Sequence, residues 1–306
     1  MEYLVFDVSG TTVKSAIMGA DGAIFQEDKH PVPAAETGSY EDFLQVLKDA
    51  YTQYAVPVDG IAVSLPGRID SEHGVVITPG ALKYNRGRHL AEDIRAQVAD
   101  LPTVIVNDGK AAAAGEYWQG NLAGTTCGVV MLLGTGIAGG IVMSGRVWEG
   151  AGSFAGEFSY VYERPAMRSE ADHRWVDSAS IPGLITYVSR RTGMKERLLD
   201  GKKIFQKIGS GNDYALAGLK DMTDYIAYMI FDTACILDPD KVLLGGSIAG
   251  EPLILQLVQE ELDRIYGLAS EDLPRVQVDI CKHPGEASLI GAEYVLLQRY
   301  SEPVSA

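Results

Sequence analysis

Hydrophobic and polar positions follow two different periods along this chain, which predicts strands interspersed with helices. Residues 3–6, 60–65 and 101–106 are short and almost wholly apolar, a pattern typical of buried strands. Residues 41–54 carry apolar side chains at helical spacing, and residues 111–119 form an alanine-rich helix directly after a strand. This alternation predicts an α/β fold with a largely buried sheet.

The same alternation continues through the second half of the chain. A long helical pattern ends at Pro239, which cannot continue a helix. A short strand is expected at 241–244, a helix at 253–266, a strand at 276–281 and a last helix at 287–300. No low-complexity linker separates the halves, so any boundary between two lobes is expected at a hinge.

A weak internal repeat connects the two halves. Residues 5–18 and 129–142 both show an apolar run, a Gly-Thr turn and a second apolar run, and Gly134-Thr135 lies 124 positions after Gly10-Thr11. A duplicated hairpin of this kind indicates two related lobes with a site between them. Chance similarity between two glycine-rich hairpins is the alternative.

The amino-acid composition argues against some classes of binding partner. The 306 residues carry 26 Lys and Arg against 41 Asp and Glu, a formal charge of −15, which argues against nucleic acid or an anionic membrane as a partner. Backbone N–H groups can still bind phosphate without net positive charge. The chain is long enough for two domains.

Cysteine usage and hydropathy indicate a cytoplasmic protein. Cys127, Cys235 and Cys281 are odd in number and far apart, so they form no disulfide framework and no CxxC metal pair. The amino-terminal residues show no basic segment followed by an apolar one, and no run approaches the roughly 18 apolar residues of a membrane span.

Residues 7–14 form the first candidate phosphate loop. Small residues in a turn after a strand leave backbone N–H groups close to any bound phosphate, and Asp7 can hold a hydrated Mg²⁺. An ordinary hairpin turn is the alternative, with Lys14 as a solvated strand charge. The candidate residues here are Asp7, Ser9, Gly10, Thr11, Thr12 and Lys14.

Two further glycine-rich turns follow strands. Gly134, Thr135 and Gly136 lie in a loop of small residues, whose backbone can come into close contact with polyphosphate. A tight β-turn with a bulge is the alternative. At Gly245-Gly246-Ser247 the missing side chains let a flat base lie against the backbone, although a plain strand-to-helix turn fits equally well.

Asn107-Asp108 carries the candidate for proton transfer. The pair ends a strand and precedes a helix, where Asp108 can act as the general base for an attacking hydroxyl that Asn107 orients. The alternative is that Asp108 only caps the helix.

Taken together, these segments resemble the ROK family of sugar kinases and sugar-responsive repressors, within the actin-like, ribonuclease H-like superfamily. The likeness covers nearly the whole chain, and its strength lies in the order and spacing of the segments. These are residues 7–14, 65–70, 107–108 with 111–116, 133–140, 156–157, and 238–239 with 244–246.

The resemblance implies a two-lobed actin-like fold with a sugar cleft between the lobes and ATP phosphates held by the two Gly-Thr hairpins. Residues 1–115 plus 287–306 would form the smaller lobe, and residues 116–286 the larger lobe with the adenosine site. It also implies Asp108 as catalytic base, Asn107 and Glu157 on sugar hydroxyls, Pro66-Gly67 near the sugar and Gly245-Gly246 near adenosine.

The chain departs from the family pattern where a histidine and a zinc motif are usual. Tyr160 stands at the histidine position, and no cysteine lies between Cys127 and Cys235, so no ordinary Cys/His zinc site is expected. His173 is expected to be a lone surface histidine. The stretch is similar to a zinc-less branch of β-glucoside kinases and glucokinase-like proteins, in which losing an imidazole beside the anomeric carbon would admit a β-linked aglycone.

Two other departures lie beside the candidate chemistry. Ser9 stands where a second glycine is usual, and Gly109-Lys110 replaces the usual Ala-Asn after the aspartate. Lys110 would either be an exposed cation at the helix start or lower the basicity of Asp108. Exposure is the expectation.

The expected reaction is transfer of the γ-phosphoryl group of ATP, with Mg²⁺, to a sugar hydroxyl, O6 of a glucose unit. Free glucose, a disaccharide, a β-glucoside, fructose and an N-acetylhexosamine all remain open as acceptors. A homodimer is a family expectation. The alternatives are a non-catalytic sugar sensor of the same family, disfavoured because the chain begins at the first strand, and an actin-like ATPase without an acceptor.

Overall fold

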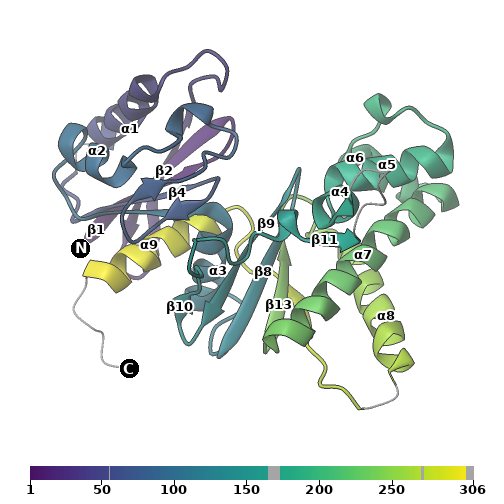
Figure 1. Cartoon of the computed structure of the whole chain (residues 1–306). Coiled ribbons are helices and arrows are strands. Elements are labelled where there is room, and N and C mark those ends of the chain that lie inside the picture. Colours follow the sequence, from purple (N-terminus) through teal and green to yellow (C-terminus); the bar gives the residue numbers. More distant parts are fainter. Residues whose placement is uncertain (55, 165–172, 270–271, 301–306) are drawn as a thin grey trace. The chain divides into compact units, whose positions relative to one another are not determined.

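The computed structural model describes residues 1–54, 56–164, 173–269 and 272–300, and the chain forms two compact units (Figure 1). Unit 1 contains Met1–Ala123, Gly140–Gly156 and the chain from Gly285 onward; unit 2 contains Gly124–Gly139 and Glu157–Pro284. The functional division into a catalytic lobe and an adenosine lobe stays a prediction.

Unit 1 is built on a five-stranded sheet with the order β3-β2-β1-β4-β7. An antiparallel meander forms one side of this sheet, and β4 and β7 run parallel to β1 on the other. The strands are β1 (Glu2–Val8), β2 (Thr12–Gly19), β3 (Ile24–Pro31), β4 (Ile61–Leu65) and β7 (Thr103–Asn107).

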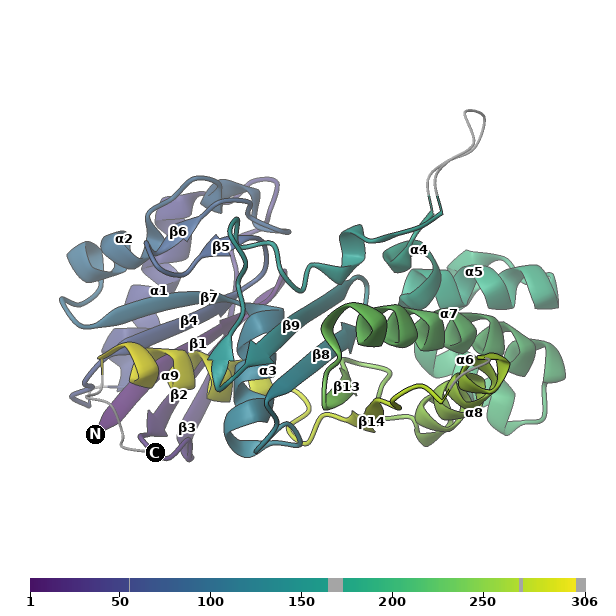
Figure 2. The same cartoon turned by 60° about the horizontal axis from the view of Figure 1, so that its bottom comes forward.

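Helices cover both faces of this sheet because its central strands are apolar on both sides. Phe6 and Val63 pack into one core with α1 (Tyr40–Tyr54) and α2 (Leu90–Gln97). Their strand neighbours Val5 and Ala62 belong to the opposite core, with α3 and α9, as Figure 2 shows for α1, α2 and α9. The two helices of that second core are α3 (Asp108–Gln119) and α9 (Ala287–Tyr300).

The α3 and α9 helices approach each other closely. A Cβ on Gly291 would lie only 1.7 Å from the carbonyl oxygen of Ala111, so this contact requires glycine. The remaining unit 1 elements are short: β5 (Ile69–Asp70), β6 (Val75–Val76), η1 (Lys83–Asn85) and β10 (Arg146–Val147).

The second sheet has the order β10-β9-β8-β13-β14, and β9 begins in unit 2 and ends in unit 1. In unit 2, β13 runs parallel to both β8 and β14. Both sheets therefore place a hairpin beside two further parallel strands in the same chain order, as the internal repeat predicts. The strands are β8 (Cys127–Leu133), β9 (Ile137–Met143), β13 (Lys241–Gly245) and β14 (Gln277–Ile280).

The helices of unit 2 gather around α7 (Asp213–Leu237), as Figure 1 shows. This helix ends where Asp238 adopts a left-handed φ of 46° and Pro239 follows. The other elements are α4 (Trp175–Ala179), α5 (Ile181–Thr192), α6 (Gly201–Gly209), α8 (Pro252–Leu268), η2 (Phe158–Tyr160), η3 (Glu196–Leu198), β11 (Tyr162–Arg164) and β12 (His173–Arg174).

The α/β fold predicted from the sequence is confirmed, and the main predicted strands and helices are present. In the described part of the chain no helix is both long and apolar enough to cross a membrane.

Candidate functional site

The candidate site in unit 1 lies where three parallel strands end. In the sheet register Asp7 of β1 pairs with Ser64 of β4, and Leu65 pairs with Asn107 of β7. The carboxyl ends of parallel strands share one edge of a sheet, so the chain segments that follow β1, β4 and β7 meet there. Topology thus brings together residues that lie about a hundred positions apart in the sequence.

The surroundings of the Asp7 carboxylate shift its pKa. Its Oδ1 accepts a hydrogen bond from Ser64 Oγ over 2.9 Å. Burial, together with the nearby charge of Asp108, raises the pKa of Asp7 to about 6, against the lowering effects of Ser64 and Lys14. Lys14 Nζ donates to the carbonyl oxygen of Gly285 over 2.9 Å, so it is anchored rather than simply solvated.

The turn between β1 and β2 is organised by Ser9. Its Oγ accepts from the N–H groups of Thr11 and Thr12 over 3.3 and 3.0 Å, and donates to the Thr12 carbonyl oxygen over 3.0 Å. Phosphate would therefore have to displace the Ser9 hydroxyl from these two donors. Phosphate binding by Ser9, Gly10, Thr11, Thr12 and Lys14 stays a prediction.

Asn107, and not Asp108, caps the helix that follows β7. The Asn107 Oδ1 accepts from the Lys110 N–H over 3.0 Å, the usual geometry of a helix N-cap. Asp108 is the first helical residue, and its Oδ1 accepts from Asn107 Nδ2 over 2.9 Å and from the Gly109 N–H over 2.8 Å. The side chain is only half-buried, and burial raises its pKa. Asp108 Oδ2 carries no hydrogen bond within the described residues, which suits a proton acceptor.

The same asparagine connects Asp108 to the loop after β4. Asn107 Nδ2 also donates to the carbonyl oxygen of Gly67 over 2.9 Å. Gly67 has a φ of +106°, and a Cβ there would lie 2.1 Å from the Thr78 carbonyl oxygen, so only glycine fits. Both N–H donors of Asn107 are thus engaged inside the protein. Sugar contacts by Asn107, Pro66 and Gly67 stay predictions.

The expectation that Lys110 is exposed is wrong. Its side chain is fully buried, and its Nζ donates to the carbonyl oxygen of Ser153 over 2.8 Å. The sequence shows only a cation near a helix start, where exposure is the rule, because Lys is almost never fully buried unless paired. The partner lies 43 residues away along the chain, and no local pattern reveals it.

In unit 2, the second glycine-rich loop joins β8 to β9. The Gly134 N–H donates to the Gly136 carbonyl oxygen over 3.0 Å, which makes a tight turn, and Thr135 is exposed at its tip. Ser159 Oγ accepts from the Ile137 N–H over 2.9 Å, so the loop is attached to the η2 segment. Phosphate binding by Gly134, Thr135 and Gly136 stays a prediction.

Glu157 and Tyr160 flank this η2 turn. Glu157 is half-buried, and Tyr160 is 54% exposed. Phe158 between them stacks on Trp175 with ring centroids 6.1 Å apart, and Gly139 leaves room for it, because a Cβ there would lie 2.5 Å from the Phe158 ring. The fold therefore holds Tyr160 toward solvent, at the position where the family pattern has histidine.

The Gly245-Gly246-Ser247 turn follows β13. Gly246 has a φ of +89°, and a Cβ there would lie 2.3 Å from the carbonyl oxygen of Leu133. A Cβ on buried Gly245 would lie within 2.7 Å of Leu132 and Cys281. Close packing against neighbouring residues thus explains glycine at both positions, while Ser247 is exposed. Their contact with adenosine stays a prediction.

One carboxylate of the candidate site, Asp7, has the chemistry that a magnesium ion uses. Among residues 1–54, 56–164, 173–269 and 272–300, no group of three or more His, Cys, Asp or Glu side chains could hold a metal. Mg²⁺ needs only one or two carboxylates because it keeps several waters and binds substrate phosphates. Asp7 Oδ2 forms no hydrogen bond to described residues, so this carboxylate fits such an ion. His173 is half-buried at the start of β12.

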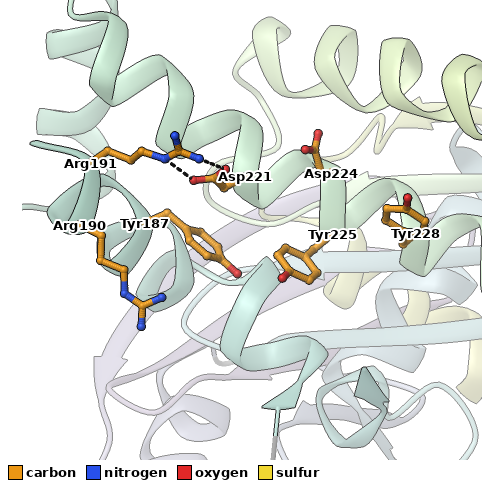
Figure 3. A pocket seen from close by; sticks show the side chains of 7 residues that line it. All are labelled: Tyr187, Arg190, Arg191, Asp221, Asp224, Tyr225 and Tyr228. Atoms are coloured by element: carbon orange, nitrogen blue, oxygen red, sulfur yellow. Dashed lines mark hydrogen bonds and ion pairs between the residues drawn. The ribbon is translucent and has the colours of Figure 1, made fainter. Parts of the chain in front are cut away.

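A separate cavity of about 530 Å³ lies between α5 and α7 in unit 2 (Figure 3). Tyr187 and Tyr225 stack there with centroids 5.9 Å apart, and Arg191 forms an ion pair with Asp221 across the two helices. It is lined by Tyr187, Arg190, Arg191, Asp221, Asp224, Tyr225 and Tyr228. None of the sequence-predicted site residues lines it, and sequence reasoning missed it because its residues come from two helices about thirty positions apart.

Comparisons with known proteins agree with the sequence resemblance. The profile described as ROK family matches residues 3–299. A beta-glucoside kinase of Klebsiella pneumoniae is 25% identical over 99% of this chain and 98% of its own length. An N-acetylmannosamine kinase of Escherichia fergusonii is 27% identical over 86% of this chain and 88% of its own length. The crystal structure of a ROK family protein from Streptococcus pneumoniae TIGR4 in complex with sucrose covers 98% of this chain and 99% of its own, with 26% identity and a TM-score of 0.87.

Proposed function

Because this chain belongs to the ROK family, we propose that it is an ATP-dependent sugar kinase. It transfers the γ-phosphoryl group of ATP to a sugar hydroxyl. Full-length similarity to relatives named as kinases supports this activity. The structural observation that carries the proposal is the Asp108 carboxylate, with one oxygen held by two donors and the other without a hydrogen bond to the described residues.

The proposed acceptor is O6 of glucose or of the glucose unit in a β-glucoside. The name of the Klebsiella relative supports a β-glucoside. Tyr160 supports it independently, because an exposed phenol stands where the family pattern has an imidazole. A flat aromatic side chain can pack against a sugar ring or an aglycone while its hydroxyl remains in water.

In the proposed mechanism, Asp108 Oδ2 takes the proton from the attacking sugar hydroxyl. Asn107 and the Gly109 N–H hold Oδ1, which fixes the direction of Oδ2. Asn107 therefore acts mainly by positioning Asp108, since its own N–H donors are already bonded. Glu157, together with the Pro66-Gly67 loop, would bind other sugar hydroxyls.

On the nucleotide side, the backbone of Gly10-Thr11 and of Gly134–Gly136 would bind phosphate oxygens, and Gly245-Gly246-Ser247 would contact adenosine. Asp7 would hold Mg²⁺ through water, and a bound Mg²⁺ neutralises charge on the transferred phosphoryl group. No structural zinc is proposed. The proposed enzyme works in the cytoplasm as a homodimer. It has no nucleic acid or membrane partner, and for this last point its net charge of −15 is the support.

The test is ADP release with Mg²⁺ and ATP across glucose, cellobiose, an aryl β-glucoside, fructose and an N-acetylhexosamine. We expect release that depends on sugar, strongest with glucose or a β-glucoside. Tight sugar binding without ADP release from any of these would identify a sensor instead, and ATP turnover that ignores sugar would identify an ATPase.

A further inference from the structure

The burial of Lys110 has a consequence for the segment that it contacts. An ammonium group loses several kcal/mol of hydration when it is buried, so its protein contacts have to compensate. Its Nζ donates to the Ser153 carbonyl oxygen, and its own backbone N–H donates to the helix cap Asn107. One lysine therefore ties a remote backbone segment to the first turn of α3, two residues after Asp108.

Residues 148–156, which we call the aromatic loop, form that segment. Five of its nine residues are Gly or Ala, so the loop has few side chains of its own to hold a conformation. Ser153 nevertheless adopts a left-handed φ of 53°, which is uncommon for a residue other than glycine. Backbone bonds from the Ser153 N–H to the Gly150 carbonyl oxygen and from the Ala155 N–H to the Glu149 carbonyl oxygen help to hold this conformation, and the Lys110 contact adds to them.

The Lys110 contact acts directly on an aromatic side chain. The Ser153 carbonyl belongs to the peptide group that joins Ser153 to Phe154, so the bond from Lys110 Nζ fixes the plane from which Phe154 projects. Phe154 is 49% exposed, so a large part of its apolar ring faces solvent. The loop then continues directly into Glu157, a proposed sugar ligand.

We propose that Lys110 is a positioning residue that holds the aromatic loop against the first turn of α3, and that Phe154 thereby forms a contact surface for the aglycone of a β-linked acceptor. The inference rests on the proposed sugar kinase function. An aromatic ring at a fixed orientation binds a flat or apolar aglycone without the entropy loss of ordering a mobile loop. Free glucose has no aglycone and gains nothing from Phe154.

Kinetics of three variants, K110M, F154A and the double variant, test this specificity role. K110M removes the ammonium and keeps most of the buried stem. We expect each single variant to raise KM for an aryl β-glucoside about tenfold or more, with KM for glucose and ATP unchanged within about twofold. The double variant should raise KM for the aryl β-glucoside no further than the more impaired single variant does, because both substitutions remove the same contact. Equal losses with glucose and aryl glucoside, or fully additive losses, would overturn the proposal.

Hydrogen exchange tests the positioning role without relying on catalysis. In K110M the amides of residues 148–156 should exchange about tenfold faster or more than in wild type, while those of β1, β4 and β7 keep their rates. K48M, at an exposed lysine of α1, is the matched control and should change neither exchange nor KM. Unchanged exchange in the loop, or a uniform rise across unit 1, would refute positioning by Lys110. K110Q, which keeps a donor, serves if K110M does not fold.

Failure of the kinase activity and failure of the aglycone contact give different experimental results. Wild type that releases no ADP with any sugar contradicts the kinase proposal. Adding aryl β-glucoside to wild type should slow exchange in residues 148–156 whether or not phosphoryl transfer occurs, and the absence of that protection would contradict the aglycone contact itself.

Discussion

The hydroxyl of Ser159 bonds to both backbone groups of Ile137. It accepts from the Ile137 N–H and donates to the Ile137 carbonyl oxygen, each over 2.9 Å. Ser159 lies in the η2 segment between Glu157 and Tyr160, and Ile137 follows the second glycine-rich loop. One side chain thus couples the proposed sugar residues of unit 2 to the proposed phosphate loop.

Replacing Ser159 should lower kcat/KM for both substrates together. S159A removes two hydrogen bonds, each worth about 1 kcal/mol, and we expect kcat/KM for ATP and for sugar to fall about five- to thirtyfold. S210A, which removes an exposed hydroxyl bonded to the Lys207 carbonyl oxygen, is the control. Steady-state kinetics with either substrate varied is the measurement, and normal kinetics in S159A would show that this link is dispensable.

Gly246 offers a separate test of the adenosine turn. In G246A the new Cβ meets the Leu133 backbone and the left-handed φ becomes strained, at a cost of at least about 1 kcal/mol. We expect KM for ATP to rise tenfold or more, with sugar binding by calorimetry retained. G250A is matched to it, because a Cβ at Gly250 meets nothing within 4 Å. If G246A and G250A bind ATP equally well, this turn does not contact the nucleotide.

Much of the architecture could be predicted because it depends on local pattern. Apolar runs identified β1, β4 and β7, and a Gly-Thr repeat identified two equivalent hairpins. The resemblance to the ROK family is confirmed by the family match over residues 3–299. Polar residues at strand ends could be chosen as candidates because parallel strands bring such ends together.

The parts that could not be predicted depend on distant partners. The ammonium of the buried Lys110 bonds to Ser153, 43 residues away along the chain. The sequence offered Asp108 as the alternative helix cap, and the structure shows that Asn107 is the cap instead. Strand β3 (Ile24–Pro31) lies at the edge of its sheet, where polar residues face solvent, so no apolar run reveals its length.

Glu293 makes the stability of unit 1 depend on pH. This α9 residue is fully buried, and neither of its carboxylate oxygens has a hydrogen-bond partner among the described residues. Burial, and to a smaller extent the charge of Asp21, raises the pKa of Glu293 to about 8. The folded state then binds a proton that the unfolded state has released, so stability is lost as pH rises from about 4.5 to about 8.

The variant E293Q should remove that dependence. Relative to wild type, we expect its free energy of unfolding to gain on the order of 2 to 4 kcal/mol between pH 5 and pH 9. Urea denaturation across this range is the measurement, with E260Q, at an exposed glutamate of α8, as control. Parallel pH profiles for wild type and E293Q would mean that Glu293 does not titrate between the two states.

Activity should fall on the acid side of neutrality. Burial raises the pKa values of both Asp7 and Asp108, and the value for Asp7 reaches about 6. Each carboxylate works in its ionised form, so kcat/KM should decline as pH drops below about 6. A rate profile at constant ionic strength tests this, and a rate that stays level down to pH 4.5, on the order of the ordinary carboxyl range, would contradict the raised values.

The most direct measurement compares wild type with D108N in sugar-dependent ADP release. The asparagine keeps an oxygen for the Gly109 N–H and loses only the basic carboxylate. We predict sugar-dependent release by wild type, a loss of about two to four orders of magnitude in kcat for D108N, and sugar affinity by calorimetry unchanged within about twofold. Turnover by D108N close to that of wild type would contradict the assignment of Asp108 as the base.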